Sequence, residues 1–419
     1  MPRILAALGL ALVVAGCGRA VPSERSAKEG SEMLAIVGAR IYTAPAGELI
    51  ADGSVVMSGD VITAVGPRER VRVPKGAAIV DGAGLTVTAG FWNAHVHFTE
   101  ARWRSAATRP AAELELELRA MLTRWGVVRV VDTGSLLENT LALRRRIQSG
   151  EIPGPQITIA SGGFVPVGGS PYYVLPARLP ELADAGRARA QVEGLLENPG
   201  VDAVKLFTGS WATRESIVVM PVDVVRAAVE AAHRRGKQVI SHPSNTAGAL
   251  AALDGGVDIL AHTFPSGLDW DRSLPRRMRD ANMALIPTLK LWPWELGRLG
   301  LPPAVIERVQ ANAEGHVRAF VEAGGQLLFG TDVGYMTDYD PTDEYLLLER
   351  AGLGFPAILA ALTTAPARRF HAEAGAGLVA AGSPAELAVL GGDPATDIRA
   401  LSKVRYTIRR GQVIHGAAP

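Results

Sequence analysis

The sequence has almost no cysteine and almost no net charge. Its 419 residues include a single cysteine, Cys17, so no disulfide can form within the chain. Forty-three Lys and Arg balance 42 Asp and Glu and leave a net charge of +1, which gives no reason to expect nucleic acid as a partner. After the N-terminus no apolar stretch is long enough to span a bilayer.

The composition is instead that of a folded chain with a large core. Hydrophobic residues make up 48% of the sequence and charged residues 20%, which excludes a disordered chain. The length suits two or three domains, and one α/β barrel alone takes about 250 residues. Neither an internal repeat nor a low-complexity segment is present.

Residues 1–17 differ from the rest and have the form of a signal peptide. Arg3 is their only charge, an apolar run covers residues 4–14, and the ending Val-Ala-Gly-Cys resembles the lipobox of bacterial lipoproteins. We therefore expect Cys17 to be lipidated, residues 18–32 to form a flexible tether, and the protein to be lipid-anchored in the bacterial cell envelope, facing the periplasm or exterior. The alternatives are an ordinary cleaved signal or a buried thiol.

The two ends of the remaining chain share a β-strand texture. Short apolar runs separated by turn residues make up residues 33–88, and the same sequence pattern is found at 376–417. Because chain termini often lie close together, we predict that both ends form one small β-sandwich domain.

The central part, residues 89–375, alternates short apolar runs with longer helical stretches. Including the strand before His95, eight β-α units predict a TIM-type (β/α)8 barrel of the α/β class. The other predicted strands are Val127–Asp132, Gln156–Ala160, Ala203–Phe207, Gln238–Ser241, Asp258–Ala261, Ala284–Pro287 and Gln326–Gly330. The predicted helices include Glu113–Trp125, Pro180–Leu196, Val222–Arg235 and Pro303–Ala323.

Four of the eight histidines fall at the ends of these strands, together with one acid and one lysine. In a strand, residues i and i+2 point to the same face, so His95 and His97 can grip one metal ion. Taken alone, they are equally two partly exposed histidines at a strand end. Active sites of parallel barrels lie where the strands end, so the whole set should converge there. It comprises His95 and His97 (first strand), Lys205 (fourth), His242 (fifth), His262 (sixth) and Asp332 (eighth).

This residue set suits a binuclear metal site. His95, His97 and Asp332 can hold one divalent cation, and His242 and His262 a second. Two cations about 3.5–4 Å apart need an anionic bridge, which Lys205 can supply if its neutral amine reacts with carbon dioxide to give a carbamate. A bridging hydroxide is then the nucleophile, and Asp332 is placed to shuttle its proton.

On these residues the chain resembles the amidohydrolase superfamily, in the branch related to imidazolonepropionases and bacterial prolidases. The resemblance covers roughly residues 34–415 and rests on GFWNAHVHF, VDAVKLF, the step from His242 to His262, and GTD at 330–332. It implies two divalent metal ions, usually zinc, held by the six residues above with carboxylated Lys205 as bridge. It also implies hydrolysis of an amide or related bond.

The sequence departs from the family pattern at two positions. Relatives often carry a substrate-holding histidine after the third strand, where this chain has Phe164. No glutamate of the kind used by nucleobase deaminases follows His242, which makes deamination less favoured. Lys290 and Arg214 are candidates for a substrate carboxylate, or are simply solvated. The four other histidines, His415 among them, are interpreted as structural.

The favoured interpretation is a lipid-anchored amidohydrolase acting on a small substrate such as a dipeptide or N-acyl amino acid. One alternative keeps the site but cleaves a lactone or ester. Another is a catalytically silent, metal-stabilised envelope binding protein, against which the complete ligand set argues.

Overall fold

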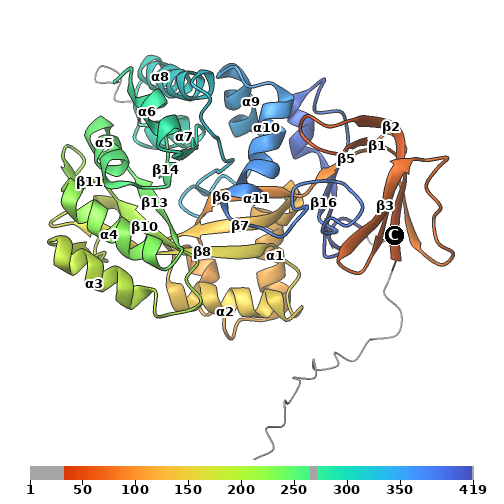
Figure 1. The fold of residues 1–419 in the computed structure, drawn as a ribbon, viewed down its shortest axis with the longest axis horizontal. Helices are drawn as coiled ribbons and strands as arrows, with labels where there is room; N and C mark the ends of the chain where they lie inside the picture. The colour runs from red at the N-terminus through yellow and green to blue at the C-terminus, as the bar shows by residue number, and fades with distance from the viewer. Residues whose placement is uncertain (1–32, 265–270, 418–419) are drawn as a thin grey trace, which may run out of the picture. The chain divides into compact units, whose positions relative to one another are not determined.

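The computed structural model describes residues 33–264 and 271–417 (Figure 1). Cys17 and the predicted tether at 18–32 lie outside the described residues, so lipidation and anchoring stay predictions. Within the described ranges, no helix combines the length and the hydrophobicity needed to cross a membrane.

Both ends of the chain contribute strands to one mixed sheet. β1 runs antiparallel to β2 and parallel to β4 and β5, and β5 pairs with β16 from the far end of the chain. Figure 1 shows the red strands β1–β3 beside the blue β16. The strands are β1 (Met33–Tyr42), β2 (Leu49–Ser58), β3 (Val61–Pro67), β4 (Ala78–Asp81), β5 (Thr86–Ala89), β16 (Leu387–Leu390), β17 (Val404–Arg409) and β18 (Gln412–His415).

A second sheet of parallel strands forms a near-closed barrel. Its order is β15-β14-β13-β10-β8-β7-β6, so neighbours in the sheet are also successive strands of the barrel. The bounds are β6 (Phe91–Val96), β7 (Val127–Thr133), β8 (Gln156–Pro166), β10 (Ala203–Phe207), β13 (Gln238–His242), β14 (Ile259–Ala261) and β15 (Ala284–Ile286). The predicted fold class is thereby confirmed.

The predicted eighth strand closes the barrel with only a few contacts. Leu327 forms a parallel bridge to Leu285 on one side, and Val333 forms one to Val96 on the other. Between these bridges, the backbone N–H of Ala94 donates to the carbonyl of Phe329 at 2.7 Å. Residues 326–333 therefore occupy the place of an eighth strand without a continuous ladder.

Helices cover the outside of the barrel (Figure 1). α4 shows why they form: its exposed Arg226, Glu230 and His233 recur at helical spacing, while the opposite face is buried Val and Ala. The helices are α1 (Ala111–Met121), α2 (Leu137–Gln148), α3 (Ala185–Leu195), α4 (Val222–Arg234), α5 (Thr246–Gly255), α6 (Leu274–Asp280), α7 (Leu291–Arg298), α8 (Pro303–Glu322), α9 (Thr342–Arg350), α10 (Phe355–Leu362) and α11 (Thr364–Arg369).

The short elements are 3-10 turns and extra strands in the connections. They are η1 (Ala101–Trp103), η2 (Thr123–Trp125), η3 (Tyr172–Val174), η4 (Ile398–Ser402), β9 (Glu181–Leu182) and the β11–β12 hairpin (Gly209–Trp211, Ile217–Val219). The helix predicted from Pro180 begins later, at Ala185. Asp184 caps α3 by accepting the N–H of Arg187, and the residues before it extend as β9.

Apolar packing fills the barrel interior below the strand ends. The side chains there are small or branched, among them Ala94, Val131, Ile240 and Ile286. The predicted site residues lie beyond this packing, at or just after the carboxyl ends of the strands.

Candidate metal centre

The six predicted site residues come from five strands and meet at one end of the barrel. Each belongs to a strand or follows it directly, and parallel strands end at the same rim. Their positions are His95 in β6 and His97 just after it, Lys205 in β10, His242 at the end of β13, His262 just after β14, and Asp332 after the closing segment.

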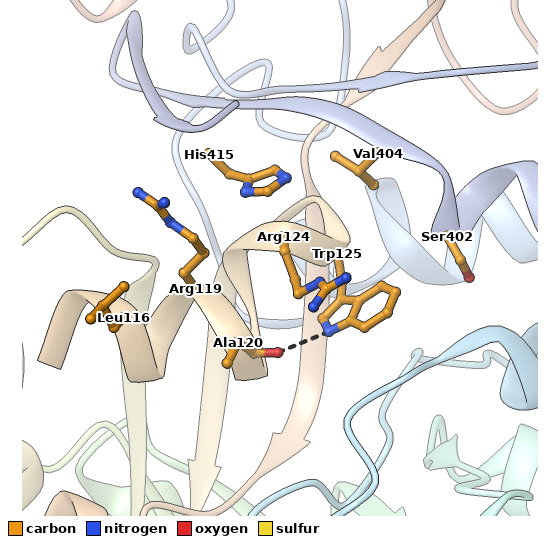
Figure 2. Close-up of a pocket in the computed structure, with 8 residues that line it drawn as sticks. All are labelled: Leu116, Arg119, Ala120, Arg124, Trp125, Ser402, Val404 and His415. Atoms are coloured by element: carbon orange, nitrogen blue, oxygen red, sulfur yellow. Dashed lines mark hydrogen bonds between the residues drawn. The ribbon is translucent and has the colours of Figure 1, made fainter. Parts of the chain in front are cut away.

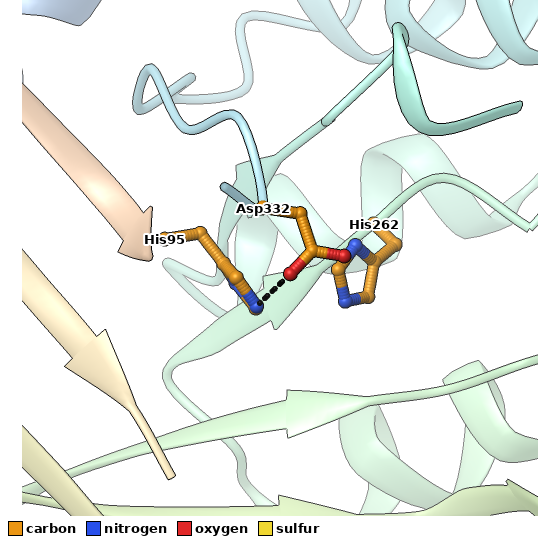
Figure 3. Close-up of side chains that lie close together, drawn as sticks. All are labelled: His95, His262 and Asp332. Carbon is orange, nitrogen blue, oxygen red and sulfur yellow. Dashed lines mark ion pairs between the residues drawn. The ribbon is translucent and has the colours of Figure 1, made fainter. Parts of the chain in front are cut away.

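The carboxylate of Asp332 lies among the imidazole rings. Its Oδ1 is 3.0 Å from Nε2 of His97 and 3.4 Å from Nε2 of His95. The ring of His262 lies 4.6 Å, between centroids, from those of both His95 and His242. One ligand atom each from His95, His262 and Asp332 lie within 4.8 Å of one another, as Figure 3 shows.

Lys205 brings a buried cationic group to this cluster. Its side chain is 1% exposed, and Nζ lies 5.4 Å from the centroid of the Phe207 ring. Burial lowers the pKa of its amine to about 8, against the attraction of Asp332. Burial and then the nearby Lys205 charge lower the pKa of His95 and of His242 to about 3, so both imidazoles are neutral near pH 7.

Burial alone would raise the pKa of Asp332. Its neighbours His95, His97 and His262 outweigh that effect and hold the pKa well below the usual value, so the carboxylate is ionised. A buried carboxylate beside imidazoles whose pKa burial lowers, as it does for His95 and His262, is a typical set of ligands for a divalent cation.

Polar atoms of the cluster lack hydrogen-bond partners in the described part of the chain. They are both ring nitrogens of His95 and Oδ1 of Asp332, all fully buried. Buried polar atoms without a partner cost about 1–3 kcal/mol each. A divalent cation bound by Oδ1 of Asp332 and one ring nitrogen of His95 would remove the cost for those two atoms, so the donor set fits a metal such as zinc.

Thr288 is a site residue that the sequence did not reveal. Its Oγ1 lies 2.7 Å from Nδ1 of His262, which leaves Nε2 as the nitrogen available to the cluster. Thr288 is fully buried and has φ of 44°, a rare conformation for a β-branched residue. Its surroundings must impose this conformation.

The segment after Thr288 is held by a buried carboxylate. Glu344 of α9 accepts the backbone N–H groups of Leu289 at 2.9 Å and Lys290 at 2.7 Å. This pair of hydrogen bonds fixes the turn that follows β15 and with it the hydroxyl facing His262. No sequence motif connects these residues, since 26 positions separate Thr288 from His262 and 56 separate it from Glu344.

Phe164 and Lys290 both make buried contacts within the chain and are not exposed to a substrate. Phe164 is 4% exposed and packs in the core between strands and helices. Nζ of Lys290 donates to the carbonyl of Asp340 at 2.6 Å and pairs with the carboxylate of Asp338 at 2.8 Å. Arg214, in contrast, is exposed, with its guanidinium 5.8 Å from the ring centroid of Tyr172.

Aromatic rings from η3, from the segment after Asp332 and from α7 lie together at this end of the barrel. Tyr173 lies 5.4 Å from Tyr335, and Tyr335 lies 5.8 Å from Trp294, between ring centroids. Asp332 is among the charges that raise the pKa of Tyr173, after burial and Tyr335. These rings therefore lie next to the cluster and form part of its wall.

This barrel carries a candidate metal site at the carboxyl ends of its parallel strands. The profile of the amidohydrolase family matches residues 86–414. The chain belongs to the amidohydrolase family.

The chain also resembles several solved structures over most of its length. A putative prolidase from Bifidobacterium longum is 26% identical with a TM-score of 0.77, over 91% of this chain and 94% of that one. A Xaa-Pro dipeptidase with bound methionine in its active site is 20% identical with a TM-score of 0.77, over 91% and 99%. A prolidase bound to N-methylphosphonate-L-proline is 22% identical with a TM-score of 0.74, over 91% and 99%. The latter two likenesses show the fold alone.

Among curated proteins, uncharacterised proteins of Mycobacterium tuberculosis and Mycobacterium bovis match a shorter region. Each is 30% identical over 160 residues, which is 36% of this chain. The matched region spans 42% of the length of these relatives.

The contact between Thr288 and His262 gives a testable prediction. Thr288→Val keeps the branched shape but removes the hydroxyl, so Nδ1 of His262 loses its partner. Because such outer contacts orient a ligand, we expect the affinity for zinc to fall about tenfold or more, measured by competition with a chelator. Thr288→Ser keeps the hydroxyl and serves as the matched control. Equal zinc affinity of the Val variant and wild type would show that the contact does not orient His262.

Proposed function

We propose that the protein is a metal-dependent amidohydrolase that cleaves an amide C–N bond in a small substrate, such as a dipeptide or an N-acyl amino acid. The observation that carries this proposal is the convergence of buried, unsatisfied ligand atoms of His95 and Asp332 beside His262. Family membership supports a C–N hydrolase. The prolidase-like neighbours, one bound to methionine, support an amino-acid-like substrate.

In this proposal the cluster would hold two zinc ions. His95, His97 and Asp332 would be ligands of one ion, and His242 and His262 would be ligands of the other. A carbamate on Lys205 would supply the shared anionic ligand. The lowered pKa of the buried Lys205 amine supports this assignment, because only the neutral amine reacts with carbon dioxide.

Divalent cations, when bound, lower the pKa of water and polarise the carbonyl that is attacked. The residues of the chain supply proton transfer and exclusion of solvent. Asp332, ionised in the cluster, accepts the proton of the attacking water and delivers it to the leaving nitrogen. The aromatic rings of Tyr173, Tyr335 and Trp294 contact one another beside the site and would help to exclude solvent from it.

In this proposal Arg214, rather than Lys290, binds a substrate carboxylate. The ammonium of Lys290 is already neutralised by Asp338 and buried. The guanidinium of Arg214 is exposed beside Tyr172, whose ring contacts that of Tyr173. An exposed guanidinium can still form a bidentate pair with a carboxylate.

We also propose that the protein acts in the bacterial cell envelope, facing the periplasm or exterior. The support is the apolar run that ends at Cys17, which would carry the lipid anchor. The partners in this proposal are a small-molecule substrate and the membrane, with no nucleic acid.

A substrate panel tests the proposed reaction against its alternatives. Zinc-loaded protein is offered dipeptides, N-acyl amino acids and lactones, with Asp332→Asn as the matched inactive control. We expect amide hydrolysis by the wild type and its loss in the control. Turnover of lactones without amides would favour the lactone or ester hydrolase instead. Zinc binding without any turnover would favour the silent binding protein.

The bridging role of Lys205 gives a separate prediction. Lys205→Ala removes the ligand proposed to be shared, so the second ion would rest on His242 and His262 alone. We expect fewer metal ions per chain by elemental analysis and a loss of hydrolysis of about a hundredfold or more, with the fold retained. Short carboxylic acids should restore part of the activity by supplying bridging oxygens. Lys75→Ala, at an exposed lysine of the mixed sheet's connections, is the control. Full metal content and turnover in Lys205→Ala would contradict the bridge.

A further inference from the structure

A second concave site lies at the opposite end of the barrel from the metal cluster. A cavity of about 270 Å³ opens between α1 and η2 on one side and η4, β17 and β18 on the other (Figure 2). η2 directly precedes β7, so the cavity lies at the amino end of that strand, whereas the cluster lies at the carboxyl ends. Seven extended residues of β7 separate these ends by about 20 Å.

The side chains around this cavity are basic. Arg119 of α1, Arg124 of η2 and His415 of β18 line it, and no Asp or Glu does so among the described residues. Burial and then the charges of Arg119 and Arg124 lower the pKa of His415. Because Arg119 is paired with Glu115, the unbalanced positive charge at the cavity is that of Arg124, and an unbalanced charge in a concave wall concentrates ions of the opposite sign.

One buried hydrogen-bonding group at the cavity is available to a ligand. Nδ1 of His415 is buried and has no hydrogen-bond partner in the part of the chain that the structure describes. Oγ of Ser402 lies 2.7 Å from Oγ1 of Thr342, which donates its own proton to the carboxylate of Asp340, so the proton of Ser402 is used by Thr342. An oxygen of a ligand would satisfy Nδ1 of His415.

Arg124 is held in place while its donors stay available. Its guanidinium lies 4.6 Å from the centroid of the Trp125 ring, and Nε1 of Trp125 donates to the carbonyl of Ala120 at 3.1 Å. Stacking uses the face of the guanidinium and leaves its in-plane N–H groups free for an oxyanion. Within the described ranges Arg124 has no carboxylate partner, while Arg119 pairs with Glu115 at 3.0 Å.

We propose that this cavity binds a phosphate group, with Arg124, Arg119 and His415 as its contacts. Arginine suits phosphate because its fork of donors matches two oxygens at once. The volume admits a phosphate with a small organic part, and exposed Leu116 and half-buried Val404 at the wall offer apolar contact to that part. The phosphate belongs either to a soluble phosphate ester or to a lipid headgroup. This site is independent of the proposed hydrolytic function.

The test is titration of the metal-loaded full chain with inorganic phosphate at constant ionic strength. Binding is followed by calorimetry and by the NMR signals of the His415 ring, which are assigned from their loss in His415→Gln. We expect saturable binding that shifts the His415 signals. Arg124→Gln and Arg119→Gln should each weaken it about tenfold. Arg189→Gln, at an exposed arginine of α3 outside the cavity, should leave it unchanged. Thermal unfolding checks that each variant is folded.

A vesicle measurement identifies the source of the phosphate. Sedimentation with phosphatidylcholine vesicles is compared with and without added phosphatidic acid, because a lipid anchor would attach the protein to both. Extra binding to phosphatidic acid that is lost in Arg124→Gln identifies a headgroup, and its absence identifies a soluble phosphate ester. Phosphate affinity that is absent, or that is equal in wild type and both arginine variants, overturns the proposal. Equal affinity would place any bound phosphate elsewhere, for example on the metals.

Discussion

Closure of the barrel between β6 and residues 326–333 is the constraint on which the site depends. The N–H of Asp332 donates to the carbonyl of His95 at 2.9 Å, and the N–H of His97 donates to that of Val333 at 2.8 Å. Nδ2 of Asn93 donates a buried hydrogen bond to Oγ1 of Thr331 at 2.7 Å. These bonds set the first and last strands in one register, and that register brings the Asp332 carboxylate to the two imidazoles.

The cluster formed by this closure is costly for the polypeptide alone. A buried amine, a buried ionised carboxylate and two buried imidazoles lie beside the half-buried His97 and His242, and some atoms of the buried groups lack hydrogen-bond partners. Strain adds to the cost, because His262, Thr288 and Asp332 all have positive φ, at 69°, 44° and 62°. Such strain gathers at functional sites, where the surrounding structure imposes it. Bound cations would offset part of this cost, which explains why the fold retains it.

Much of the fold was predictable because it depends on local pattern. The strand Ala203–Phe207 was predicted with its observed bounds, since a continuous apolar run is typical of a strand buried on both faces. The candidate site residues could be proposed from the same pattern, because Lys205 and His242 are polar residues inside or at the end of such a run. The start of α3 was misplaced because the capping role of Asp184 was not recognised.

Features that depend on contacts distant in sequence could not be predicted. Thr288 looks like an ordinary residue after a strand, and its role follows only from the position of Glu344 on a later helix. The pairing of Lys290 with Asp338 likewise decides against a substrate role that its sequence position allowed.

The most direct test of the central claim is anomalous X-ray diffraction from zinc-loaded crystals, recorded above and below the zinc absorption edge. The account predicts two anomalous peaks at the barrel mouth, one beside His95, His97 and Asp332 and one beside His242 and His262. Continuous density should join Lys205 to both. The absence of an anomalous signal at the carboxyl end of the barrel, or zinc bound only at surface residues away from these six, would contradict the proposed metal site.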